Sequence, residues 1–158
     1  MPQGRIVGRK GNGVAEVSGS RRKIAAVHGA NTAFLFGQSK GRDLWQSALL
    51  GPHLIVQALT AGAAVFQPWW LLWLLPVNGL LVAGEVWGHH ATEDARRAAR
   101  LIQEDVRFSS GVLAVGHLLP LALLWSGQGV LFAGALTLAG LLTWEHLYVE
   151  KPQLVPLA

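Results

Sequence analysis

The sequence has no cysteine, and it has few charged residues of either sign. Without thiols, the chain can form no disulfide and can supply no thiolate to zinc or to an iron–sulfur cluster. Only 14% of its 158 residues are charged whereas 51% are hydrophobic, a balance too apolar for an ordinary soluble domain. The sequence also lacks a nucleophile elbow, a phosphate-binding loop and an HExxH zinc motif. We therefore expect no catalytic centre in this chain.

Lysine and arginine are absent from four long apolar stretches, at about 45–66, 69–87, 109–125 and 129–148. All 13 cations precede the first stretch, lie between the second and third, or follow the fourth. Loops that stay in the cytoplasm keep Lys and Arg, whereas translocated loops lose them. The pattern predicts an all-α integral membrane protein, a four-helix bundle of two antiparallel hairpins with both termini in the cytoplasm.

The formal net charge of +4 favours anionic lipid over nucleic acid as a partner. The cations flank apolar stretches and are not interleaved with aromatic residues, and the cytoplasmic leaflet attracts such basic segments. We therefore predict an inner (plasma) membrane location, membrane lipid as a partner, and no nucleic acid.

The remaining segments are polar or short. Residues 1–29 are basic and Gly-rich and predict a disordered tail without the apolar core of a signal peptide, and the membrane domain is expected over 30–158. Residues 24–38 are too few to cross a membrane. In 91–108 acidic residues precede basic ones, which predicts a short helix on the cytoplasmic surface.

Tryptophan and small residues mark two further features of the predicted spans. Indole rings prefer the membrane–water interface, and six tryptophans lie at or near span ends: Trp45, Trp69, Trp70, Trp87, Trp125 and Trp144. The fourth span carries the small residues Ala133, Thr137 and Gly140 on one face, which would let a neighbouring helix approach closely.

Polar side chains within the spans are the candidates for function, because an ionisable group there costs about 2.5–3.5 kcal/mol to insert. His53 and His117 are each expected about 12 Å into a span. Glu85 and Glu145 are each expected about 24 Å from the uncharged end of their spans, near the cytoplasmic edge, and Gln57 extends the polar stripe of His53. The candidates for a proton path or a polar bundle interior are His53, Asn78, Glu85, His89, His117 and Glu145.

Alternative interpretations stay open for these groups. The two histidines could ligate a b-type haem, take part in quinol chemistry or a proton relay, or form interhelical hydrogen bonds, which is the simplest interpretation. The two glutamates could be proton stations or interfacial partners of arginine. The sequence around His89 and His90, with Glu93 and Asp94, has the composition of metal ligands but also suits a helix end.

Six segments, in order and with their spacing, match one known pattern from about residue 30 onward. They are Thr32–Gln38 (TAFLFGQ), Gly41–Ser47 (GRDLWQS), His53–Ala63 (HLIVQALTAGA), Thr92–Ile102 (TEDARRAARLI), Gly116–Pro120 (GHLLP) and Trp144–Leu157, which ends in Gln-x-x-Pro-Leu. These segments resemble the NrfD-like family, the membrane anchor subunits of polysulfide-reductase-type molybdenum complexes.

The resemblance implies a non-catalytic role. It implies a membrane anchor subunit, or the C-terminal half of one, in a quinone-linked oxidoreductase with an iron–sulfur subunit and a molybdopterin catalytic subunit as partners. The subunit would support quinol electron transfer and proton movement. Anchors of this family carry no haem or metal, so we expect no cofactor on this chain and quinone only in the full complex.

The chain also departs from the family pattern. Family members usually have eight or more spanning helices, and this sequence resembles only their C-terminal half. Their quinone pocket is formed largely by the N-terminal bundle, so no quinone-site residue can be assigned here. Two alternatives therefore stay open: a small b-type haem membrane protein, and a non-functional truncated remnant.

Overall fold

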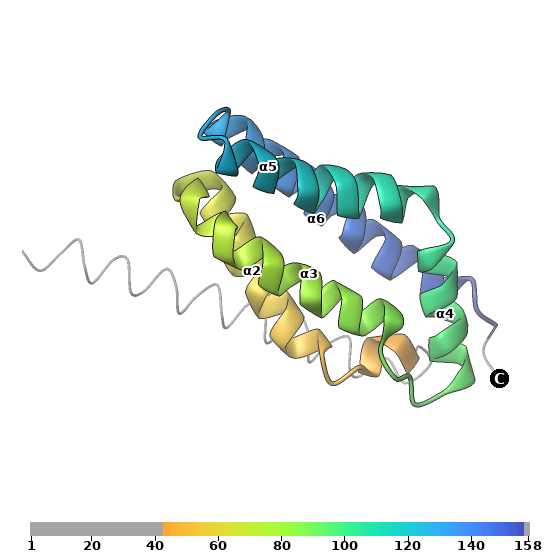
Figure 1. Ribbon diagram of the computed structural model, residues 1–158. Helices are drawn as coiled ribbons and strands as arrows, with labels where there is room; N and C mark the ends of the chain where they lie inside the picture. Colours follow the sequence, from red (N-terminus) through yellow and green to blue (C-terminus); the bar gives the residue numbers. More distant parts are fainter. Residues whose placement is uncertain (1–42, 157–158) are drawn as a thin grey trace, which may run out of the picture.

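The computed structural model describes residues 43–156, and every regular element in that range is helical (Figure 1). The predicted tail, 1–29, and the apolar segment 24–38 lie outside the described residues. In chain order the elements are the 3-10 helix η1 (Asp43–Gln46), α2 (Leu50–Phe66), the 3-10 turn η2 (Pro68–Trp70), α3 (Leu71–Trp87), α4 (Glu93–Gln103), the π-helix η3 (Phe108–Leu118), α5 (Leu119–Trp125) and α6 (Val130–Gln153).

Three stretches of helix are long and apolar enough to cross a membrane, at Pro68–Trp87, Phe108–Trp125 and Val130–Gln153. They correspond to the last three predicted spans. The first prediction, 45–66, is too long, because α2 begins only at Leu50 and has 17 residues. Pro52 explains the late start: it has no N–H to donate, so it is tolerated in the first turn of a helix but not deeper inside one.

The helices form two antiparallel pairs, α2 with α3 and the continuous η3–α5 segment with α6 (Figure 1). The turns around Gln67 and Gly127 lie at one end of the molecule, whereas η1, α4 and the end of α6 lie at the other (Figure 1). Gly127 and Gly129 have φ angles of 71° and 62°, which only glycine adopts readily, so they shape the turn into α6. The described cations all belong to the α4 end, as the sequence predicts.

Helix α4 is the short amphipathic helix expected within 91–108. Its first turn is capped by the Thr92 hydroxyl, which accepts a hydrogen bond of 3.2 Å from the Ala95 backbone N–H. Ala95, Ala98, Ala99 and Ile102 are buried, whereas the arginines of this helix are exposed. The helix therefore covers the end of the bundle with its apolar face.

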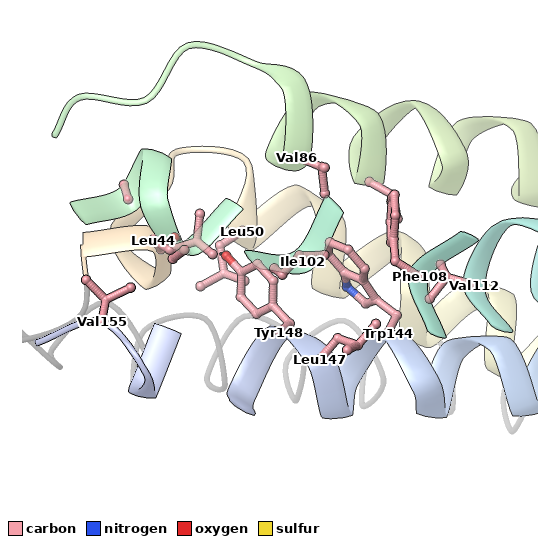
Figure 2. Close-up of a cluster of buried hydrophobic side chains, with 13 residues drawn as sticks. Leu44, Leu50, Val86, Ile102, Phe108, Val112, Trp144, Leu147, Tyr148 and Val155 are labelled. Carbon is pink, nitrogen blue, oxygen red and sulfur yellow. Dashed lines mark hydrogen bonds between the residues drawn. The ribbon is translucent and has the colours of Figure 1, made fainter. Parts of the chain in front are cut away.

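The larger apolar core lies beneath α4, where all helical elements except η2 and α5 contribute side chains (Figure 2). The Phe108 ring lies between Trp87 and Trp144, with ring centroids 5.5 Å and 6.3 Å away. Tyr148 donates its hydroxyl hydrogen to the Leu44 carbonyl at 3.0 Å, and the Trp45 indole donates to the Tyr148 carbonyl at 3.0 Å. These two bonds fix η1 against α6.

The position of Trp144 near a predicted span end suggested that it lies at the membrane–water interface. Trp144 is instead buried. Only 2% of its surface is exposed, and its ring packs against those of His53 and Tyr148. The reason is that α6 continues to Gln153, five residues beyond the predicted end at 148, so Trp144 faces the core beneath α4. Trp69, Trp70, Trp87 and Trp125 are exposed at helix ends, in agreement with the prediction.

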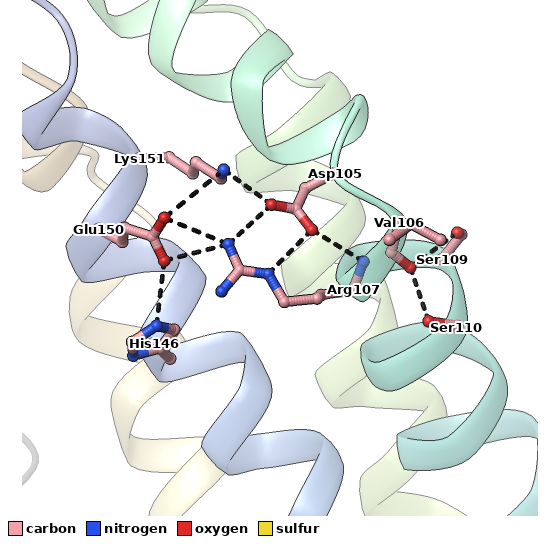
Figure 3. Close-up of polar contacts among 8 residues, drawn as sticks. All are labelled: Asp105, Val106, Arg107, Ser109, Ser110, His146, Glu150 and Lys151. Atoms are coloured by element: carbon pink, nitrogen blue, oxygen red, sulfur yellow. Dashed lines mark hydrogen bonds and ion pairs between the residues drawn. The ribbon is translucent and has the colours of Figure 1, made fainter.

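A ring of charges joins the loop between α4 and η3 to the end of α6 (Figure 3). Arg107 contacts Asp105 at 2.8 Å and Glu150 at 3.1 Å, and Lys151 contacts Asp105 at 2.7 Å. His146 completes the group at 3.0 Å from Glu150. Hydrogen bonds from Arg107 and then from Lys151 hold the pKa of the Asp105 carboxyl well below its usual range, so this carboxylate stays ionised.

Small residues bring η3 and α6 into backbone contact. Gly116 of η3 faces Gly140 of α6, and a Cβ built on Gly116 would lie 2.6 Å from the Gly140 Cα. Ala133, Thr137 and Gly140 are all buried, which confirms the close-packing face predicted for this helix. In a π-helix such as η3, backbone hydrogen bonds run from i to i+5, a rare geometry often found at functional sites.

Gly116→Ala tests this contact. We expect it to lower the unfolding free energy by about 1–3 kcal/mol, because the added methyl group must push α6 away. Thermal unfolding in detergent, followed by circular dichroism, measures the change.

Gly62→Ala is the matched control, because no atom lies within 4 Å of a Cβ built on this α2 glycine. It should leave stability unchanged or raise it by about 0.5–1 kcal/mol, since alanine favours helix. Equal effects of the two substitutions would contradict the proposed contact.

Candidate functional site

Polar side chains extend through the interior of the helix bundle. Each is buried, and together they come from four helices: His53, Gln57 and Thr60 from α2, Asn78 and Glu85 from α3, His117 from η3, and Thr137 from α6. The three from α2 follow the spacing i, i+4, i+7 and therefore share one helix face. This polar interior is the candidate site.

A buried contact between a histidine and a glutamate lies at the α4 end of this interior. The His53 Nδ1 is 3.3 Å from a Glu85 carboxylate oxygen, and their side chains are only 1% and 0% exposed. His53 is in the first turn of α2 and Glu85 in the last turn of α3, so the antiparallel pairing brings the two together. The Trp144 ring, 5.4 Å from the imidazole between centroids, covers the pair from α6.

Glu145 of α6 belongs to the same group. It interacts electrostatically with His53 and Glu85 and also with the Gln57 side chain. The sequence placed Glu85 and Glu145 at equal depth, and the structure brings them into one cluster. Neither carboxylate forms a salt bridge with an arginine among the described residues, and the arginines of the tail lie outside them.

His117 is held on both sides. Its Nδ1 is 2.8 Å from the Val112 carbonyl oxygen, and its Nε2 is 3.2 Å from the Asn78 amide nitrogen. A carbonyl can only accept, so Nδ1 carries the proton, and Nε2 then accepts from the Asn78 amide. This pattern fixes one neutral tautomer of the ring.

The two histidines do not lie at equal depth, contrary to the prediction. His53 is level with Glu85 and His117 with Asn78, and these α3 partners are seven residues, about 10 Å, apart. The difference arises because α2 starts at Leu50, which places His53 in its first turn. Two axial ligands of one haem iron must reach the same metal, so this spacing disfavours the haem alternative.

His89 does not join the site. Helix α3 ends at Trp87, so the helical face predicted for Asn78, Glu85 and His89 stops before His89, which is exposed. In the part of the chain that the structure describes, no three His, Asp or Glu side chains gather as metal ligands, including those around His90.

Several buried polar atoms in this interior have no hydrogen-bond partner among the described residues. They are His53 Nε2, Gln57 Oε1, Asn78 Oδ1, both Glu85 oxygens and Thr137 Oγ1. An unpaired buried polar atom is costly, and natural proteins keep such groups mainly where they have a further role.

Sequence reasoning overlooked part of this interior. Thr60 was not considered, although its i+7 spacing from His53 indicates the same face. Trp144 was assigned to the interface, although it precedes Glu145 and lies four residues before Tyr148, in a segment that the core needs.

Comparisons of the chain with protein-family models, with curated proteins and with solved structures found no match.

A double-mutant cycle tests the His53–Glu85 contact. We expect Glu85→Gln and His53→Phe each to destabilise the protein, because each leaves the other polar group buried without its charged partner. Thermal unfolding in detergent should show the double variant to be less destabilised than the sum, with a coupling of about 0.5–3 kcal/mol.

Glu93→Gln makes the same chemical change on the exposed surface of α4 and should have little effect. Strict additivity of the two buried substitutions would show that His53 and Glu85 do not interact.

Proposed function

We propose that this chain is a non-catalytic membrane subunit of a quinone-linked molybdenum and iron–sulfur oxidoreductase, and that its polar interior carries protons. The observation that carries the proposal is the buried His53–Glu85 pair at the α4 end of the polar interior. In this proposal the chain spans the inner membrane four times, with both termini and α4 on the cytoplasmic side.

The helix lengths support four spans. Helix α2 has 17 residues, about 26 Å, which is at the short end of membrane-crossing helices. It packs antiparallel to α3, which also has 17 residues, so the two would cross together. Exposed leucines, valines and tryptophans cover the outer faces of these helices, as expected for a surface in contact with lipid.

Several residues that build the interior lie in the segments behind the family resemblance, whereas Asn78 and Glu85 of α3 lie outside them. His53 and Gln57 come from the segment His53–Ala63, and His117 from Gly116–Pro120. The last resembling segment supplies Trp144, Glu145 and Tyr148 around the ion pair. This coincidence supports the redox-anchor proposal, since a chance likeness need not fall on one cluster.

The proton chemistry follows from the pair itself. With one shared proton, His53 and Glu85 are either an imidazolium beside a carboxylate or a neutral imidazole beside a carboxylic acid, and both forms have no net charge. Loss of that proton leaves a single buried negative charge. Such a pair can pass a proton between the α4 end and the polar groups deeper in the bundle.

The orientation is tested with single cysteines, which this cysteine-free chain allows. A cysteine at Glu104, which is exposed, should react with an impermeant maleimide only after the cytoplasmic side is exposed. A cysteine at Ser126 should react in intact cells. The reverse result, or labelling of both from one side, would contradict four spans with cytoplasmic termini.

Co-purification tests the complex. The tagged chain, extracted from its native membrane in mild detergent, should recover an iron–sulfur subunit and a molybdopterin subunit, identified by mass spectrometry and by bound iron and molybdenum. A tagged membrane protein of unrelated sequence is the control.

In the recovered complex, Glu85→Gln should slow quinol turnover, whereas Glu93→Gln should not.

Recovery of the intact chain from the membrane without either subunit would refute the redox-anchor proposal. Equal turnover of the Glu85→Gln and Glu93→Gln complexes would refute the proton role alone.

A further inference from the structure

A small open pocket of about 210 Å³ lies where α3 ends and α4 packs against it. Its polar lining comes from four basic side chains and one amide, beside one tryptophan: His89, His90, Arg96, Arg100, Gln103 and Trp87. No Asp or Glu lines the pocket. The pocket is therefore suited to an anion.

The basic side chains differ in whether they already have a partner, and therefore in how freely they can bind an anion. Arg100 forms no ion pair within residues 43–156, whereas Arg96 contacts Glu93 at 2.7 Å. The His90 Nε2 is buried and has no hydrogen-bond partner among the described residues. The Gln103 amide donates to the Val86 carbonyl at 2.7 Å, which holds α4 against the end of α3 and shapes the pocket.

An exposed apolar stripe leads along α3 to this pocket. Trp73, Val77, Leu80 and Trp87 follow the spacing i, i+4, i+7, i+14, which places them on one helix face. Their surfaces are 80%, 45%, 73% and 57% exposed. Trp87 belongs to both the stripe and the pocket, so the apolar face is continuous with the basic one.

We propose that the pocket binds the phosphate of an anionic phospholipid whose acyl chains lie along this stripe. Arg100 pairs with the phosphate, and His89 and His90 donate to its oxygens or to the headgroup. Anionic lipid fits better than zwitterionic lipid because the pocket presents basic groups without a carboxylate. The inference rests on the membrane location proposed above but not on any redox partner.

Lipid retention measures this site. The full chain is reconstituted into nanodiscs of equal phosphatidylglycerol and phosphatidylcholine, released gently, and examined by native mass spectrometry for bound lipid. We expect phosphatidylglycerol to be retained in preference. Arg100→Gln should reduce that preference about fivefold, because one Lys or Arg near anionic lipid contributes about that factor.

Arg97→Gln is the matched control. Arg97 lies on the same helix and loses the same charge, but its side chain is 61% exposed and does not line the pocket. An equal loss in both variants would mean general surface attraction and would overturn the site. Arg100→Lys keeps the charge and should retain most of the preference, which separates a binding defect from misfolding.

Inorganic phosphate distinguishes the two sources of the anion. At millimolar concentration it should not displace phosphatidylglycerol, because it gains nothing from the apolar stripe. Displacement would identify a free-anion site and overturn the lipid assignment. Wild-type chain that never enters the membrane fraction would overturn the membrane location itself, and with it this site.

Discussion

The contact between His53 and Glu85 joins the ends of α2 and α3 that lie opposite the turn at Gln67, where Leu50 and Val86 belong to the same apolar core. An isolated buried charge is expensive, so each group requires the other, and the pairing favours the antiparallel register of α2 and α3. The same register places Asn78 beside His117, which connects the first helix pair to η3. The polar interior thus specifies how the apolar helices are arranged.

The close approach of η3 and α6 complements this polar register. Where Gly116 meets Gly140 the two backbones touch, and no side chain separates them. On the same helix α6, the Trp144 ring covers His53, and the Glu145 carboxyl interacts electrostatically with His53 and Glu85. The small residues and the polar residues therefore contribute to the same packing of the helices. Helix α4 and the Asp105–Arg107 contact cover one end of this packed interior.

Helix positions were largely predictable from the sequence, because apolar length, loop charge and turn residues are local signals. The start of α2 was less predictable, because two signals disagree. The apolar run begins at Trp45, whereas the proline near the first turn indicates a later start. The depth of His53 and the burial of Trp144 were not predictable, because both depend on how far one helix extends past another. The equal depth of Glu85 and Glu145 could be predicted, because each residue lies about 24 Å along its helix from the uncharged end.

Helix α2 contains 17 residues, about 26 Å of helix, whereas a typical hydrocarbon core is about 30 Å thick. The exposed charges of α4 and the ionic ring of Asp105, Arg107 and Lys151 cap the bundle at one end. In the proposed membrane arrangement, a bilayer beside α2 would thin by a few ångströms to match this helix. Hydrophobic mismatch would concentrate the protein where the membrane is already thin and would favour shorter-chain lipids at its edge.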